Sequence, residues 1–93
     1  MLYATDHVRR TSRAAWQELE GETVLLLSQE ERLLGLNAVG GRIWQLADGS
    51  RSVGEISAAI GLEFAGAERS IVDDALRFLE RLLERGLVER CGA

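Results

Sequence analysis

The side chains that could do chemistry in this chain of 93 residues are few and lie far apart. His7 is the one histidine and Cys91 the one cysteine. A disulfide or a redox pair needs a second thiol, and Cys91, the third residue from the end, is expected to be a frayed terminal thiol. His7 falls in a segment without periodicity, where no Ser-His, Cys-His or His–metal arrangement can be built. We therefore expect no catalytic residue, no metal and no cofactor.

Two adjacent glycines, Gly40 and Gly41, are the next candidate, because glycine-rich turns at helix starts can cradle a phosphate. A P-loop requires Gly-x-x-x-x-Gly-Lys-Ser/Thr, and this chain contains no lysine. The Gly-x-Gly-x-x-Gly dinucleotide fingerprint is absent as well. A glycine within a helix costs about 1 kcal/mol relative to alanine, so two in succession need a structural reason. We expect that reason to be close approach of the first helix to the sheet.

The net charge of the chain argues against nucleic acid and anionic lipid as partners. The chain has eleven arginines and fifteen acidic residues, which gives a net charge of −4. Such a chain has no general electrostatic attraction to nucleic acid or to anionic lipid. The apolar run Val24–Leu27 is far shorter than the ~20 residues that span a bilayer. No signal peptide opens the chain, so a cytoplasmic protein without membrane or nucleic-acid partners is expected.

The elements that must position any binding site begin with three strand-like runs, at 13–19, 22–28 and 32–37. Glu20-Gly21 between the first two predicts a tight hairpin. The middle run is apolar on both faces, which predicts cover on both sides, at least in part. Residues 1–12 show no periodicity and are expected to form a loosely ordered lead-in to a domain that spans 13–90.

Helical signals follow the strands. Asn37 predicts the N-cap of a first helix, which ends at Asp48-Gly49. A Ser-x-x-Glu capping box at 52–55 opens a second helix, which stops at Gly61. The third helix, at 68–85, is the strongest element. The layout predicts an α+β fold of winged helix-turn-helix type, with a three-stranded antiparallel sheet followed by three helices.

The third helix carries more apolar surface than one-sided burial requires. Its apolar residues fill an arc of about 160°, against a minimum stripe of about 100° for a helix on a core. The excess is explained either by a deeper core or by an edge left for a partner. A helix-turn-helix of this kind raises DNA binding as an alternative function. The first turns of the would-be recognition helix, however, carry Glu68, Arg69, Asp73 and Asp74, whose carboxylates would face phosphate.

The third strand, Arg32–Leu36, offers a different working surface. Proteins usually guard a sheet edge with Lys, Pro, a bulge or a covering element, and this strand has Arg32 but no interior charge and no Pro. Gly35 predicts either a bulge or the close approach of another backbone. An apolar edge beside a wide apolar helix could accept a peptide as an added strand. Residues 1–12 or a second copy of the chain could equally cover it.

Several short motifs resemble the PqqD-like family of precursor-peptide recognition domains. They occur in the family order over 16–88, about four-fifths of the chain, and comprise Leu36-Asn37, Asp48-Gly49, Arg51-Ser52-Val53, Asp74, Phe78-Leu79 and Gly86-Leu87. The resemblance implies a non-catalytic adaptor that binds the leader of a ribosomally made precursor peptide and presents it to a modifying enzyme. That enzyme would be a radical-SAM enzyme, as in pyrroloquinoline quinone synthesis, or a leader protease, as in lasso-peptide pathways.

The resemblance also implies where the leader binds, namely as an extra strand between the third strand and the third helix. The peptide-binding residues expected on this basis are Arg32, Leu33, Leu34, Gly35 and Leu36 on the strand, and Ile71, Asp74, Ala75, Arg77, Phe78 and Arg81 on the helix. The chain would act as a monomer or as a dimer paired through the free edge.

Overall fold

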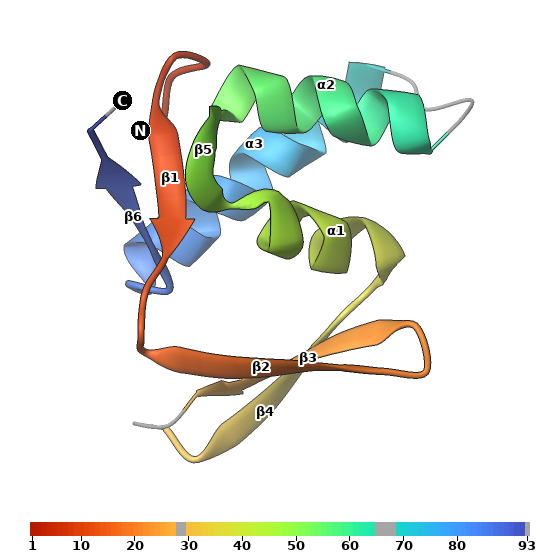
Figure 1. Cartoon of the computed structure of the whole chain (residues 1–93), viewed down its shortest axis with the longest axis vertical. Helices are drawn as coiled ribbons and strands as arrows, with labels where there is room; N and C mark the ends of the chain where they lie inside the picture. The colour runs from red at the N-terminus through yellow and green to blue at the C-terminus, as the bar shows by residue number, and fades with distance from the viewer. Residues whose placement is uncertain (28–29, 65–68, 93) are drawn as a thin grey trace.

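Two small sheets and three helices make up the computed structural model, which describes residues 1–27, 30–64 and 69–92, with the side chains of α3 from Asp73 onward. Figure 1 shows α1 lying between one sheet and helix α2, with α3 behind them. In chain order the elements are β1 (His7–Arg10), β2 (Ala14–Leu19), β3 (Glu22–Leu27), β4 (Arg32–Leu36), α1 (Ala38–Leu46), β5 (Asp48–Ser52), α2 (Val53–Glu63), α3 (Arg69–Glu84) and β6 (Val88–Cys91).

The predicted three-stranded sheet is confirmed as the antiparallel order β2-β3-β4. Glu20 and Gly21 both have positive φ, at 51° and 82°. Positive φ at both central residues is what a two-residue type I′ hairpin requires. The β3–β4 register runs without interruption through Val24 and Gly35, so Gly35 marks no bulge. The face of β3 that carries Leu25 is fully buried. The opposite face is covered only in part, since Leu26 there is 44% exposed.

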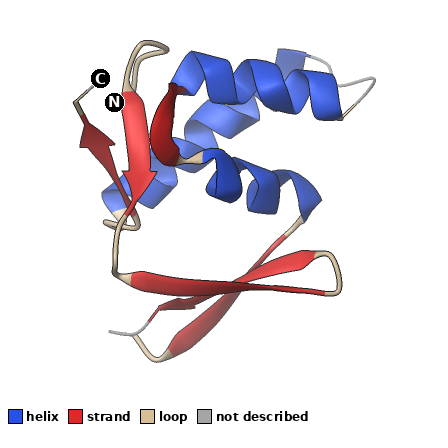
Figure 2. Cartoon of the chain, viewed as in Figure 1, coloured by secondary structure: helices blue, strands red, loops and turns tan. Residues whose placement is uncertain are grey.

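A second sheet, β5-β1-β6, corrects the expectation of a loosely ordered lead-in (Figure 2). Residues 7–10 form its central strand, paired with β5 on one side and β6 on the other. Val8 is completely buried, and Leu2 is nearly so. Periodicity did not predict this strand because His-Val-Arg-Arg has one apolar residue and no alternation, and its pairing partners lie 39 to 84 positions away along the chain.

Helix α1 begins as predicted, with the Asn37 side chain accepting a hydrogen bond from the backbone N–H of Gly40 at 2.7 Å. The expected close approach is found at the second glycine. A Cβ on Gly41 would lie 2.5 Å from Thr23 Oγ1 and 3.0 Å from Thr23 Cβ, and Thr23 is buried on β3. The glycine therefore lets α1 rest on the sheet, which explains the pair without a phosphate.

Gly41→Ala is expected to lower the free energy of unfolding by about 1–2 kcal/mol, because overpacking against the branched Thr23 outweighs the gain in helix propensity. Gly61→Ala is the matched control. Gly61 also lies within a helix, and a Cβ there would meet nothing within 4 Å. This control should raise the stability by up to ~1 kcal/mol. Urea unfolding measures both, and equal effects of the two substitutions would contradict the packing account.

Helix α2 has the predicted capping box. Ser52 Oγ accepts from the N–H of Glu55 at 3.1 Å, and the Glu55 carboxylate accepts from the N–H of Ser52 at 2.9 Å. These bonds hold the pKa of Glu55 below its usual value. The helix runs two residues past the predicted stop at Gly61, to Glu63. Glu63 there pairs with Arg42 of α1 at 2.8 Å, which ties the first two helices together.

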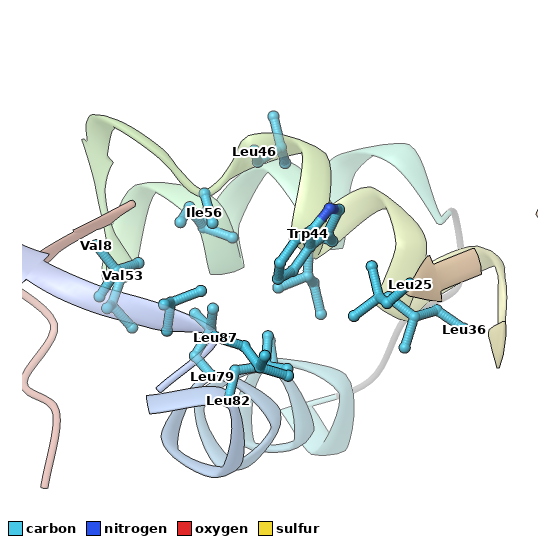
Figure 3. Packing of buried hydrophobic residues seen from close by; sticks show 14 of the residues in the cluster. Val8, Leu25, Leu36, Trp44, Leu46, Val53, Ile56, Leu79, Leu82 and Leu87 are labelled. Atoms are coloured by element: carbon cyan, nitrogen blue, oxygen red, sulfur yellow. The ribbon is translucent and has the colours of Figure 1, made fainter. Parts of the chain in front are cut away.

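The core gathers around Trp44 of α1, which is completely buried (Figure 3). Leu25 and Leu36 approach it from one sheet, and Leu79 and Leu82 approach from α3. Helix α3 buries its predicted stripe only in part. Ala75, Leu79 and Leu82 are buried, whereas Leu76, Phe78 and Leu83 are half-buried. The excess apolar arc therefore leaves one edge of α3 open, and that edge includes Phe78.

Candidate binding groove

A groove of about 670 Å³ separates β4 from α3. One wall is the last part of β4, from Leu34 to Leu36, and the opposite wall is α3 from Asp74 onward, together with Arg85 directly after the helix. The start of α1 closes the groove between them. The groove thus joins three segments that are separate in sequence, and its position follows from how α1 seats on β3.

The floor of the groove is apolar. Six side chains form it, namely Leu34, Leu36, Val39, Ile43, Phe78 and Leu82. Leu36, Ile43 and Leu82 belong to the buried core, while Leu34, Val39 and Phe78 are half-buried and remain accessible. Gly40 lies beside this floor. A Cβ at this position would lie 3.2 Å from the N-cap oxygen Asn37 Oδ1 and in ordinary contact, 3.5 Å, with Phe78 Cζ. Of the two glycines, it is therefore Gly41 that the packing of the helix on the sheet requires.

The helical rim of the groove is charged. Arg77 and Arg81 of α3 and Arg85, the first residue after that helix, follow one another at four-residue intervals and all line the groove, together with Asp74. Arg77 lies 3.9 Å from Asp74 in a well-exposed pair, and Arg85 pairs with Glu30 at 3.1 Å. Arg81 forms no ion pair with any residue in the described part of the chain.

The outer edge of β4 borders this groove. β4 pairs with β3 on one side, and within 1–27, 30–64 and 69–92 no strand pairs with its other side. Residues 7–10, which the sequence left as a possible cover, belong to the other sheet. Gly35 leaves the edge open, since a Cβ there would meet nothing within 4 Å. A free strand edge beside an apolar floor is the geometry that strand addition requires.

Most of the predicted site residues lie in the groove. Leu34, Gly35, Leu36, Asp74, Ala75, Arg77, Phe78 and Arg81 are among its lining residues. Arg32 and Leu33 belong to β4 but do not line the groove, and Leu33 is 71% exposed. The side chain of Ile71 lies outside the described residues.

Sequence reasoning missed six lining residues: Asn37, Val39, Gly40, Ile43, Leu82 and Arg85. Leu82 and Arg85 could have been found, because each lies four residues beyond a predicted one and so shares its helix face. The lining residues at the start of α1 are not related by helical spacing to any predicted site residue, because only tertiary packing brings that helix into the groove.

His7 and Cys91 are closer than the sequence indicated, because they occupy opposite positions in the β1–β6 pair. His7 Nδ1 lies 3.0 Å from the backbone oxygen of Gly49, and Cys91 is a free, half-buried thiol. Neither residue lines the groove. The described residues contain no group of three or more His, Cys, Asp or Glu arranged to hold a metal ion. No helix in the described part of the chain is long and apolar enough to cross a membrane.

Comparison with solved structures supports the same fold. The chain matches a structure described as TbiB1 in complex with the TbiA(beta) leader peptide, with a TM-score of 0.74, 29% identity, and coverage of 91% of this chain and 99% of that one. A lasso peptide synthetase B1 complexed with a leader peptide matches with a TM-score of 0.74 over 89% of this chain and 98% of that one. Its 17% identity establishes likeness of fold alone.

Sequence comparison gives the family. A curated relative from Bradyrhizobium diazoefficiens, described as a PqqA binding protein, is 28% identical over 69 residues, which cover 74% of this chain and 67% of the relative. The family model for coenzyme PQQ synthesis protein D matches residues 22–88, from the start of β3 to the start of β6. The resemblance inferred from the motifs is thereby confirmed: the chain belongs to the PqqD family.

Proposed function

We propose that this chain is an adaptor that binds the leader segment of a ribosomally synthesised precursor peptide and presents it to a modifying enzyme. The observation that carries the proposal is the free edge of β4 beside the apolar groove against α3. The named relative is described as binding PqqA, and the TbiB1 structure was solved with a leader peptide, which supports the same class of ligand here.

Binding by strand addition divides the work between backbone and side chains. The N–H and C=O groups on the outer edge of β4 pair with the peptide backbone and supply affinity that is independent of sequence. The alternate side chains of the peptide enter the groove, where Leu34, Val39 and Phe78 cover them and provide selectivity. Gly35 leaves room for the backbone of the added strand to lie against β4.

The adaptor acts without chemistry of its own. Holding leader and enzyme together raises the effective concentration of the modification site at the enzyme. We propose a radical-SAM enzyme or a leader protease as that partner, in the cytoplasm. Because the edge of β4 is the binding surface, an edge-paired dimer would compete with the peptide, and the monomer is the form that binds.

An NMR titration tests the proposal. The probe is the leader region of the precursor peptide encoded beside the gene, added to the isotope-labelled chain. We expect chemical-shift changes that cluster along β4, at Arg32–Leu36, and at residues 74–85, because β4 supplies the edge for the added strand and the second segment lines the groove. His7 and Cys91, in the other sheet, serve as internal controls that should not shift. Changes spread over β5-β1-β6 instead would contradict the proposed groove.

Duplex DNA is the comparison arm of the same titration, since a winged helix-turn-helix fold also suits a DNA-binding module. Asp73 and Asp74 are exposed at the start of α3, where their charge repels phosphate. We expect no response to DNA at physiological salt. A DNA response that weakens steeply with salt, with silence from the leader, would replace the adaptor by a DNA-binding protein.

A further inference from the structure

We infer that the peptide held in this groove is acidic on one face, with Asp or Glu at two-residue intervals opposite Arg77, Arg81 and Arg85. The inference rests on the proposed function, which it deepens by giving the chemical class of the leader. The observation behind it is that three arginines spaced four residues apart, two on α3 and one directly after it, line the same rim of a groove that borders a free strand edge. The backbone N–H of Arg85 donates to the oxygen of Arg81 at 3.1 Å, which continues the helical spacing to the third arginine.

The spacing of the arginines matches that of an extended peptide. Four residues of α-helix advance about 6.0 Å along the axis, which is the step from Arg77 to Arg81 and again from Arg81 to Arg85. Two residues of a β-strand advance about 6.7 Å. Side chains on one face of an added strand therefore meet the arginines one for one. The accumulated mismatch over both steps, about 1.4 Å, is within reach of a flexible arginine side chain.

The charge of the groove has the opposite sign to that of the chain. Its described lining holds three arginines and one carboxylate, Asp74, for a local charge of +2, whereas the whole chain carries −4. Asp74 and Glu30 hold two of the arginines only through exposed pairs, which water and salt screen. Arg81, at the middle of the row, has no ionic partner among the described residues. A bound carboxylate would supply that partner.

The apolar floor of the groove determines which residues lie between the acidic ones in the bound peptide. Successive side chains of a strand point to opposite faces, so a peptide that places one face on Phe78 and Leu82 offers the other to the rim. The favoured segment is therefore one in which apolar and acidic residues alternate. A net acidic charge without the two-residue interval would not satisfy the row of arginines.

A random peptide library displayed against the folded chain tests this pattern. We expect the selected peptides to share Asp or Glu at two-residue intervals, with apolar residues between them. Selection of peptides that bind in the groove but show no acidic pattern would overturn the inference while leaving the adaptor role intact. A failure to select any peptide, together with no response to the natural leader, would overturn the proposed function and the inference with it.

Affinity measurements on one selected peptide test the arginines directly. Arg81→Gln is expected to weaken binding about two- to fivefold, as for an exposed ion pair, and Arg81→Glu by about tenfold. Arg51→Gln is the control, because Arg51 is a partly exposed arginine of β5 and lies outside the groove. Circular dichroism checks that each variant is folded.

A charge exchange separates an electrostatic contact from a structural effect of the substitution. In the selected peptide, the acidic residue that faces Arg81 is replaced by lysine. We expect the lysine peptide to bind the wild-type chain poorly. We expect it to bind the Arg81→Glu variant more tightly than the original peptide binds that variant. Equal affinity of both peptides for both proteins would show that Arg81 takes no part in recognition.

Discussion

Phe78→Ala is expected to weaken leader binding about 10- to 100-fold. Phe78 projects from α3 into the middle of the groove, half-buried, and its ring reaches the start of α1 beside Gly40. Truncation of a side chain that anchors a ligand at the centre of an interface typically costs about 2 kcal/mol or more, which lies within this range of affinity loss. Fluorescence anisotropy with a labelled leader peptide from the neighbouring precursor gene measures the effect.

Leu62→Ala is the matched control for this substitution. Leu62 is another large apolar residue on a helix, but it is 84% exposed on α2 and does not line the groove. We expect its removal to leave both affinity and fold unchanged. If Phe78→Ala stays folded and binds the leader as tightly as the wild type, the peptide occupies another surface.

Deletion of residues 1–10 is expected to abolish folding. It removes the central strand of β5-β1-β6 and exposes the surface that Val8 and Leu2 cover. It also removes Arg10, whose guanidinium donates to the backbone oxygens of Trp44 and Gln45 at 2.8 Å. These bonds satisfy carbonyls in the last turn of α1, where helical partners run out. The oxygen of Trp44 accepts in addition from the N–H of the C-cap residue Ala47, at 3.3 Å. The amide dispersion of the NMR spectrum reports the loss.

A single substitution in the N-terminal segment tests the same contribution to stability. Val8→Asp places a carboxylate at a completely buried position, with an expected cost of several kcal/mol. Tyr3→Asp makes a similar change in the same segment at a side chain that is 64% exposed. This control should cost little. Thermal unfolding compares the two variants.

The same experiments decide where the domain begins. Without residues 1–12, a domain that starts at 13 lacks the part of the core that Val8 and Leu2 supply. If the chain that starts at residue 13 nevertheless folds and binds the leader like the full chain, the N-terminal strand is dispensable and the predicted boundary at 13 is correct.

Local features of this fold were predictable because their causes are local. The Glu20-Gly21 hairpin, the Asn37 N-cap and the capping box at 52–55 each depend on residues within four positions of one another. The helical period of α3 likewise identified its buried face, and the excess width of its apolar arc corresponds to the accessible edge at Phe78. Such signals predicted the three helices and the sheet β2-β3-β4.

The second sheet escaped prediction for the opposite reason. β1 is four residues long, β5 has no apolar residue, and β6 follows α3 nearly eighty residues after β1. None of these strands would be stable alone. They form because α2 and α3 bring their ends together around Val8, and a periodicity analysis does not contain that information.

The sequence by itself determined the three helices, the sheet β2-β3-β4 and the family resemblance, because each is encoded in neighbouring residues, in helical spacing or in short motifs in a fixed order. The resemblance in turn implied most of the residues that form the two walls of the groove. The tertiary structure alone decided that α1 enters the groove and that the N-terminal strand completes the core. These features depend on how Gly41 seats α1 on Thr23 and on strand pairs distant in sequence, which only the packed chain brings together.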